Sequence, residues 1–378
     1  MKPYLLVSGD FVRSGGMDMA NFSLASYLAD QGHEVHLVAH RVAEELAHRP
    51  NVRVHRTPKP LRSYLLGETF LNHVGRYWAA RLENRGGRVI VNGGNCQWRT
   101  SNWVHYVHAA YQPDGEGSIY RRMKRALSHR IFLANERRAL LKSSLIITNS
   151  AGTQADVTRC YPVAPERVHT VYYGVDQEHF RPPTAEERVA SRAALGWPAD
   201  RPVVLFAGAL SDDRKGFGCV FEAWKMLCAD ATWDVELAVA GDGSTLPAWK
   251  QRAAEAGLSR RIHFLGFQNG ISRVMAACDA LVSPTQYEAY GLAVQEALCS
   301  GLPAFVTARA GIAERYPSSL NELLIRNPKD VAELCRRLQD WRKRMDHYRD
   351  TVSDFSRELR ARTWDHACAQ LVELIESA

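Results

Sequence analysis

Short apolar runs alternate along this chain with segments in which apolar residues recur every three or four positions. In the first half, six such runs predict buried strands: 4–7, 35–39, 52–54, 88–91, 104–107 and 145–148. Residues 19–30 carry apolar side chains at helical spacing, and Gly32 follows as a stop signal. Strands that alternate with helices predict a parallel sheet covered on both faces.

The same alternation begins again after a linker that contains Pro182 and Pro183. Further strands are predicted at 203–208, 235–240, 262–265 and 280–282. A chain of 378 residues is too long for one ordinary core. We therefore predict an α/β protein with two Rossmann-like doubly wound domains, 1–173 and 174–355, which face each other across a cleft. Ligands of such sheets bind beyond the carboxyl ends of the strands.

Composition narrows the class of protein. An apolar fraction of 46% and a charged fraction of 24% are typical of a soluble globular protein. No apolar run approaches the roughly 18–20 residues that span a bilayer. The eight cysteines are scattered singly, so we expect neither a disulfide framework nor a zinc site, and we expect the chain in the cytoplasm. A net charge of +7 is compatible with binding to phosphorylated substrates, anionic lipid or nucleic acid, and it does not distinguish among these partners.

The most informative stretch is 283–303. A strand ends there at a Ser-Pro turn, and Gly291 precedes a helix, with Glu288 in the turn and Glu296 inside the helix. A helix N-terminus offers free N–H groups and a positive dipole end to a phosphate. The two carboxylates would instead accept hydrogen bonds from hydroxyl groups of a ribose and a sugar. The stretch predicts a nucleotide-sugar site; the alternative is a buried strand–helix unit with two solvated glutamates.

Adjacent cations follow the strand at 203–208. Arg214 and Lys215 precede Gly216 in the turn after that strand. A diphosphate leaving group gains negative charge as its bond to the sugar breaks, and fixed cations stabilise that charge. The alternative is a solvated basic turn.

The stretch 283–303 resembles the E-x7-E signature of the retaining glycosyltransferases of family 4, which have the GT-B fold. The resemblance covers nearly the whole chain, with its motifs concentrated between Ala207 and Gly311. It implies that Glu288 lies by the donor sugar and that Glu296 binds the nucleotide ribose. It also implies that the last helix, here 356–378, crosses back onto the first domain.

The resemblance implies roles for several further residues. Gly16 would lie against the donor diphosphate and the acceptor, because only glycine lets the backbone approach so closely. The diphosphate would be held by two cations and by a helix N-terminus: Arg214, Lys215, Tyr290, Gly291 and Leu292. The family usually has an arginine at the position of Ala209, so Lys215 matches its motif better than Arg214. Tyr173 stands where the family commonly has asparagine.

Two histidines lie at the predicted strand 104–107. Because side chains of a strand alternate between its faces, His105 and His108 should point to opposite sides and are poor candidates for one metal site. His108 is nearer the carboxyl end and resembles the histidine that the family sets beside the sugar's primary hydroxyl. His105 would then be packed or solvated.

Residues 120–133 are dense in cations with interleaved apolar residues. If the segment is helical, its apolar side chains share one side, and such a basic amphipathic helix can lie on an anionic membrane surface. Related enzymes with lipid-linked acceptors often dock in this way. The alternative is a solvated helix that packs its apolar stripe on its own domain.

The function expected from the resemblance is retaining transfer of a hexose from a UDP- or GDP-sugar. The acceptor would be a glycan or lipid-linked saccharide in cell-envelope or exopolysaccharide synthesis, made in the cytoplasm or at the inner face of the plasma membrane. We expect no metal and no cofactor beyond the donor, and no nucleic-acid partner. Two alternatives remain: a nucleotide-sugar 2-epimerase-like GT-B enzyme, and a non-catalytic basic module that binds nucleic acid. The sequence names neither the donor, the acceptor nor the oligomeric state.

Overall fold

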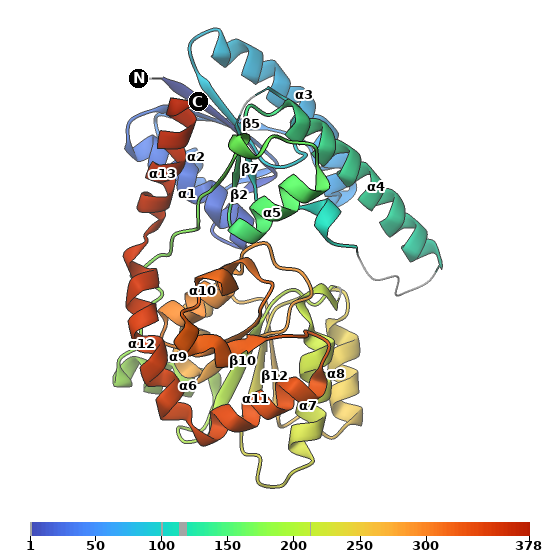
Figure 1. Ribbon diagram of the computed structural model, residues 1–378, viewed down its shortest axis with the longest axis vertical. Helices are drawn as coiled ribbons and strands as arrows, with labels where there is room; N and C mark the ends of the chain where they lie inside the picture. Colours follow the sequence, from blue (N-terminus) through green and yellow to red (C-terminus); the bar gives the residue numbers. More distant parts are fainter. Residues whose placement is uncertain (1, 100, 113–118, 212) are drawn as a thin grey trace. The chain divides into compact units, whose positions relative to one another are not determined.

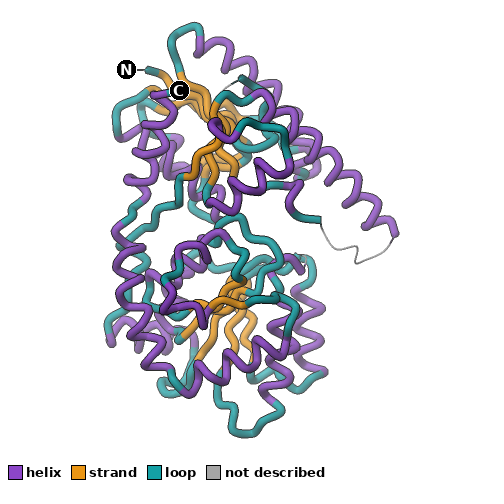
Figure 2. The backbone as a smooth tube through the Cα atoms, in the orientation of Figure 1, coloured by secondary structure: helices purple, strands orange, loops and turns teal. Residues whose placement is uncertain are grey.

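The computed structural model describes residues 2–99, 101–112, 119–211 and 213–378, and it divides into two compact units (Figure 1). The first unit is formed by Met1–Gly174 together with Trp364–Ala378, and the second by Val175–Thr363. Each unit is built around its own parallel sheet, with helices on both sides of the strands (Figure 2).

The first unit has a seven-stranded parallel sheet in the order β5-β3-β1-β6-β7-β8-β9. Its strands are β1 (Pro3–Val7), β3 (Glu34–Ala39), β5 (Val52–Arg56), β6 (Arg88–Val91), β7 (Ser101–Val104), β8 (Leu145–Thr148) and β9 (Val168–Thr170), with a small pair β2 (Asp10–Phe11) and β4 (Arg41–Val42). Its helices are α1 (Gly16–Asp30), α2 (Glu44–Ala47), α3 (Tyr64–Glu83), α4 (Ile119–Lys142), α5 (Ala151–Cys160) and α13 (Trp364–Ser377), with 3₁₀ helices η1 (Pro60–Arg62), η2 (His108–Ala110) and η3 (Pro165–Arg167).

The second unit has a six-stranded parallel sheet in the order β12-β11-β10-β13-β14-β15. Its strands are β10 (Val203–Ala207), β11 (Glu236–Ala240), β12 (Ile262–Gly266), β13 (Ala280–Ser283), β14 (Ala304–Thr307) and β15 (Leu324–Ile325). Its helices are α6 (Ala185–Leu195), α7 (Phe217–Cys228), α8 (Leu246–Glu255), α9 (Ile271–Ala277), α10 (Leu292–Cys299), α11 (Val331–Lys343) and α12 (Met345–Ala361), with 3₁₀ helices η4 (Asp213–Lys215), η5 (Gly311–Arg315) and η6 (Ser318–Leu323).

Continuous apolar runs form the central strands because both faces of each sheet are covered. Every residue of β1 is buried, and so is every residue of β8, β11, β13 and β14. Helix starts are set by side chains that accept from the first free N–H groups: Ser150 caps α5, and Thr184 forms a capping box with Glu187 at α6.

Two expectations about element boundaries need correction. The strand expected at 104–107 occupies 101–104 instead, so neither His105 nor His108 lies within a strand. The helix expected from 356 is two helices, because the chain breaks at Arg362 and Thr363 between α12 and α13. Consequently residues 356–363 belong to the second unit. The remaining part of the expected helix, α13, belongs to the first unit, where it packs against α1.

Candidate functional site

In the second unit, the loops after β10 and β13 lie next to each other. β10 pairs with β13 in parallel, so the carboxyl ends of both strands meet at one edge of the sheet. The β10 loop carries Arg214 and Lys215, and the β13 loop carries Glu288. The sheet topology therefore joins the two segments that the sequence singled out, although they are 73 residues apart.

A set of hydrogen bonds fastens these two loops. The backbone N–H of Gln286 donates to the Arg214 carbonyl at 2.8 Å, and the Thr285 hydroxyl donates to the same oxygen at 3.0 Å. The Gln286 amide donates to the Asp213 carboxylate at 2.9 Å. Gly216 has a left-handed backbone (φ +76°), and a Cβ there would overlap the Pro284 carbonyl oxygen. Only glycine permits this backbone contact.

Lys215 and Glu288 form an ion pair through Nζ and Oε2. Their side chains are 22% and 17% exposed, so the pair is partly shielded from water but remains accessible. Arg214 is engaged differently: its Nη1 donates to the Tyr287 carbonyl at 3.2 Å, which ties the arginine to the β13 loop. Lys215 thus directly contacts the acidic residue of the turn.

The N-terminus of α10 presents unpaired backbone donors beside this ion pair. Gly291 caps the helix in the left-handed region (φ +108°), and the N–H groups of Val294 and Gln295 return to its carbonyl at 3.0 and 3.1 Å. Within the described part of the chain, the N–H groups of Gly291, Leu292 and Ala293 have no acceptor. The Tyr290 ring is buried and its hydroxyl donates to Gln295, so only its backbone could face a ligand.

Glu296 lies in the second turn of α10 and is only partly exposed. Burial raises the pKa of its carboxyl group to about 8, with a further contribution from the charge of Asp176. No hydrogen bond or ion pair reaches this carboxyl group from the described residues. A desolvated carboxyl group without a protein partner is suited to accept hydrogen bonds from ligand hydroxyls.

In the first unit, the loop after β1 leads into α1 through two glycines. The left-handed backbone falls on Gly15 (φ +84°), which caps α1, while Gly16 is the first residue of the helix. Asp18 in the first turn was not predicted as a site residue. Burial and the charge of Asp10 raise the pKa of Asp18 to about 7, and its carboxyl group has no protein partner in the described residues.

Asp10 lies beside this helix start and is fully buried. Its Oδ2 accepts from Arg41 Nη2 at 2.6 Å and from the Tyr64 hydroxyl at 2.5 Å. Oδ1 of Asp10 is buried without a hydrogen-bond partner. The polar cluster around Asp10, Asp18, Arg41 and Tyr64 is thus incompletely satisfied by the protein itself.

The two histidines have separate environments. His105 is buried, its Nε2 lies 2.8 Å from Asn92 Nδ2 and its Nδ1 contacts the Tyr173 hydroxyl. Burial lowers the pKa of His105 to about 3, so this residue is a neutral member of a core hydrogen-bond network. His108 begins η2, and its ring stacks on Phe132 with centroids 5.0 Å apart. Burial, and then the charge of His129, lower the pKa of His108 to about 4.

Comparisons with known proteins identify the family. A family model described as Glycosyltransferase Family 4 matches residues 14–179, and one described as Glycosyl transferases group 1 matches 187–354. The 2-deoxystreptamine N-acetyl-D-glucosaminyltransferase of Streptomyces fradiae is 30% identical over 373 residues, which cover 91% of this chain and 86% of that protein. The chain belongs to glycosyltransferase family 4. The predicted family is therefore confirmed.

Solved structures confirm the GT-B fold of this glycosyltransferase. Sucrose-phosphate synthase from Thermosynechococcus elongatus superposes with a TM-score of 0.78 at 19% identity, covering 100% of this chain and 99% of that one. HepE from Anabaena, in complex with UDP and glucose, gives a TM-score of 0.74 at 18% identity and covers both chains completely. The two Rossmann-like units are those of a GT-B enzyme.

The glycosyltransferase exposes apolar side chains along α4. Met123 and Leu127 are 69% and 61% exposed, and Ile131 is also exposed, so this stripe is not packed on its own domain. Basic residues such as Lys124 and Arg125 lie among them. Tyr120 and Arg121 belong to the same predicted patch but fall outside the side chains that the structure describes.

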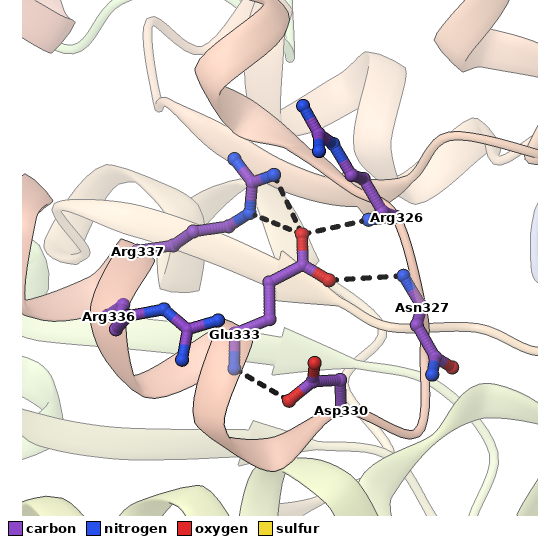
Figure 3. A pocket seen from close by; sticks show the side chains of 6 residues that line it. All are labelled: Arg326, Asn327, Asp330, Glu333, Arg336 and Arg337. Atoms are coloured by element: carbon purple, nitrogen blue, oxygen red, sulfur yellow. Dashed lines mark hydrogen bonds and ion pairs between the residues drawn. The ribbon is translucent and has the colours of Figure 1, made fainter.

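A hollow of about 410 Å³ lies at the start of α11, away from the residues that the sequence singled out (Figure 3). Its centre is the buried carboxylate of Glu333, which accepts from the backbone N–H groups of Arg326 and Asn327 at 3.0 and 3.1 Å and from Arg337 Nη2 at 2.7 Å. Because both oxygens of Glu333 accept hydrogen bonds from the protein, this carboxylate fixes the entry into α11.

Over the residues that the structure describes, no group of three or more histidine, cysteine, aspartate or glutamate side chains is arranged to hold a metal ion. In the same residues, no helix combines the length and the apolar character that crossing a bilayer requires.

Proposed function

We propose that this glycosyltransferase moves a hexose from a nucleoside diphosphate sugar, with UDP or GDP as the nucleotide, to an acceptor hydroxyl with retention of the anomeric configuration. The observation that carries the proposal is the Lys215–Glu288 ion pair beside the three unpaired N–H groups of Gly291, Leu292 and Ala293. A cation and a helix N-terminus together attract a diphosphate. A neighbouring carboxylate that is held by that cation is placed to accept hydrogen bonds from the sugar.

The reaction follows from these charges. The bond between the anomeric carbon and the phosphate oxygen breaks, and the electron pair leaves with the diphosphate, where Lys215 and the α10 N–H groups stabilise it. The acceptor oxygen forms its new bond on the same face of the sugar, and its proton passes to the departing phosphate. Glu288 orients the donor sugar and stabilises the positive charge that develops at the anomeric carbon. Arg214 contributes mainly by holding the β13 loop.

Two other residues recognise the donor in this proposal. Glu296 accepts hydrogen bonds from the ribose hydroxyls, which agrees with its unpartnered carboxyl group. His108 contacts the primary hydroxyl of the sugar. Because the pKa of His108 is about 4, its imidazole is neutral near pH 7, and a neutral imidazole exchanges hydrogen bonds with a hydroxyl rather than acting as a general acid.

We further propose that transfer needs no metal ion, because Lys215 and the α10 N-terminus supply positive charge at the diphosphate. Activity that survives dialysis against a chelator would support this part of the proposal. Activity that is lost with the chelator and restored by Mg²⁺ or Mn²⁺ would overturn it, while leaving the donor site intact.

The acceptor that we infer from the resemblance is a glycan or a lipid-linked saccharide. The exposed apolar stripe of α4 and its neighbouring cations support docking on an anionic membrane, where a lipid-linked acceptor would lie. This placement would put the enzyme at the inner face of the plasma membrane as a peripheral protein.

A second acceptor class is favoured by Asp18. The S. fradiae relative is named for transfer to 2-deoxystreptamine, a cyclitol that carries amino groups. The unpartnered Asp18 carboxyl group lies at the Gly15 turn, where the family resemblance puts the acceptor, and it could pair with an ammonium group. Asp18→Asn would then weaken transfer to an amine-bearing acceptor and leave transfer to a neutral saccharide unchanged.

Thermal unfolding against a panel of UDP-, GDP- and ADP-sugars tests the donor. A true donor raises the melting temperature by binding linkage, and its nucleotide alone should give part of the rise. The anomeric configuration of the product, read by NMR, tests retention. A sugar nucleotide that is isomerised or hydrolysed without any acceptor would favour an epimerase-like enzyme, and the absence of any donor-induced shift would overturn the proposal.

A further inference from the structure

Glu136 of α4 is fully buried and holds the turn that carries His108. Its Oε1 accepts from the backbone N–H of His108 at 3.0 Å, and its Oε2 accepts from the N–H of Ala109 at 3.4 Å. The Tyr161 hydroxyl, at the end of α5, donates to Oε2 as well. All three donors hydrogen-bond to the Glu136 carboxylate, so α4 fixes the position of the start of η2.

The same face of α4 also contacts the His108 side chain. His129, Phe132 and Glu136 follow one another at spacings of three and four residues, which puts them on one side of a helix. The Phe132 ring stacks on the His108 ring with an interplanar angle of 12°, and the His129 ring lies 6.5 Å away. α4 therefore restrains His108 at both its backbone and its imidazole.

Burying a carboxylate to accept hydrogen bonds from two backbone N–H groups carries an unfavourable desolvation free energy. Moving a carboxylate out of water is strongly unfavourable unless its hydrogen bonds are complete. Burial, followed by the nearby charge of Glu68, raises the pKa of Glu136 to about 7, while the bonds from Tyr161, His108 and Ala109 lower it. A charge-assisted acceptor at this point gives a more rigid turn than a neutral or solvated one.

We propose that Glu136 is a positioning residue for donor recognition, which sets the orientation of the His108 imidazole and hence the preference for a sugar with a primary hydroxyl. This inference rests on the proposed function, in which His108 contacts that hydroxyl. A site that hydrogen-bonds a substrate hydroxyl discriminates against analogues that lack it only when its own group is held in place.

The test compares kcat/KM for the active donor with kcat/KM for the same nucleotide sugar lacking the 6-hydroxyl group. Glu136→Gln keeps the size of the side chain but replaces one acceptor oxygen by an NH₂ group, and should lower this ratio about tenfold, the effect of losing one charge-assisted hydrogen bond. Tyr161→Phe removes one donor to Glu136 and should lower the ratio by less. Binding of the free nucleotide should be unchanged in both variants.

Glu68→Gln is a matched control. Burial raises the pKa of Glu68 to about 7 as well, and its carboxylate also bonds to α4, but through the Asn135 side chain rather than through the His108 turn. Because removal of the Glu68 charge favours the ionised form of Glu136, the ratio of this variant should not fall below that of the wild type. In the double variant with His108→Ala, Glu136→Gln should cause no additional loss.

Each outcome separates the two levels of the proposal. If His108→Ala lowers the ratio but Glu136→Gln and Tyr161→Phe do not, the inference about Glu136 is wrong and the proposed function stands. If His108→Ala leaves the ratio unchanged, the role of His108 in the proposed function is wrong and the inference is overturned with it. A further loss on adding Glu136→Gln to His108→Ala would show that Glu136 acts elsewhere. If Glu136→Gln does not fold, Tyr161→Phe carries the test.

Discussion

Glu296→Gln should make the free enzyme more stable at alkaline pH while weakening its binding of the nucleotide. The carboxyl group has a pKa of about 8 in the folded protein instead of the ordinary value of 4.5. Between these two values the folded state holds a proton that the unfolded state has lost, so stability falls as pH rises. The destabilisation is complete above about pH 8 and disappears near pH 4.5.

The size of the effect follows from the pKa. At about 1.4 kcal/mol per pKa unit, a rise from 4.5 to about 8 corresponds to at most about 5 kcal/mol. Because Glu296 is partly exposed, water screens its charge, and we expect roughly 2 kcal/mol. Glutamine has nearly the same shape and carries no charge, so Glu296→Gln should recover this amount at pH 8.5.

The assay is thermal unfolding of both proteins at pH 5 and pH 8.5 without ligand. At about 2–4 °C per kcal/mol, the variant should unfold roughly 5 °C higher than the wild type at pH 8.5 and at nearly the same temperature at pH 5. Glu255→Gln, at an exposed position of α8, is the control and should show no such difference. Equal melting temperatures of wild type and Glu296→Gln at pH 8.5 would refute the reasoning, because the carboxyl group would then not be desolvated.

Three further predictions concern the loops after β10 and β13 and the helix α4. Lys215→Ala and Glu288→Gln should each reduce kcat by at least about 100-fold with intact folding, because both residues act on charge that develops in the transition state. Steady-state kinetics measure this effect, and wild-type turnover in either variant would reject the assignment. Gly216→Ala should destabilise the second unit by about 2–4 kcal/mol in urea unfolding, because it combines an unfavourable φ with backbone overlap at Pro284. Gly257 has a similar left-handed backbone but lies in open space, so Gly257→Ala should destabilise the protein less. Replacing the cations of 122–125 by glutamine should release the enzyme from anionic vesicles in a sedimentation assay; unchanged binding would count against membrane docking.

Strands were the most predictable feature of this protein. The apolar runs 88–91 and 145–148 form β6 and β8 with the expected limits, because strands buried on both faces must be apolar throughout. The expected strand at 104–107 is displaced to 101–104, since the polar residues Ser101 and Asn102 are buried by pairing with β6 and β8 rather than by being apolar. Hydrophobic pattern alone does not reveal such burial.

The candidate site was predictable where residues are close in sequence and less so where the fold joins them. The spacing of Glu288 and Glu296 around a helix start is visible along the chain. The partnership of Glu288 with Lys215 depends on the pairing of β10 with β13, which periodicity does not specify. Asp18 and Glu136 gave no signal in the sequence, because a carboxyl group becomes distinctive only once its burial and its partners are known.

The first unit is completed by the last residues of the chain. α13 follows the whole of the second unit in sequence but packs against α1, and Val175 pairs with Thr363, so the outgoing and returning segments run side by side. During synthesis the ribosome therefore releases α13, which completes the first unit, only after the second unit has emerged. Until then the part of α1 that α13 covers stays exposed, and a stop codon before residue 364 would leave it exposed permanently.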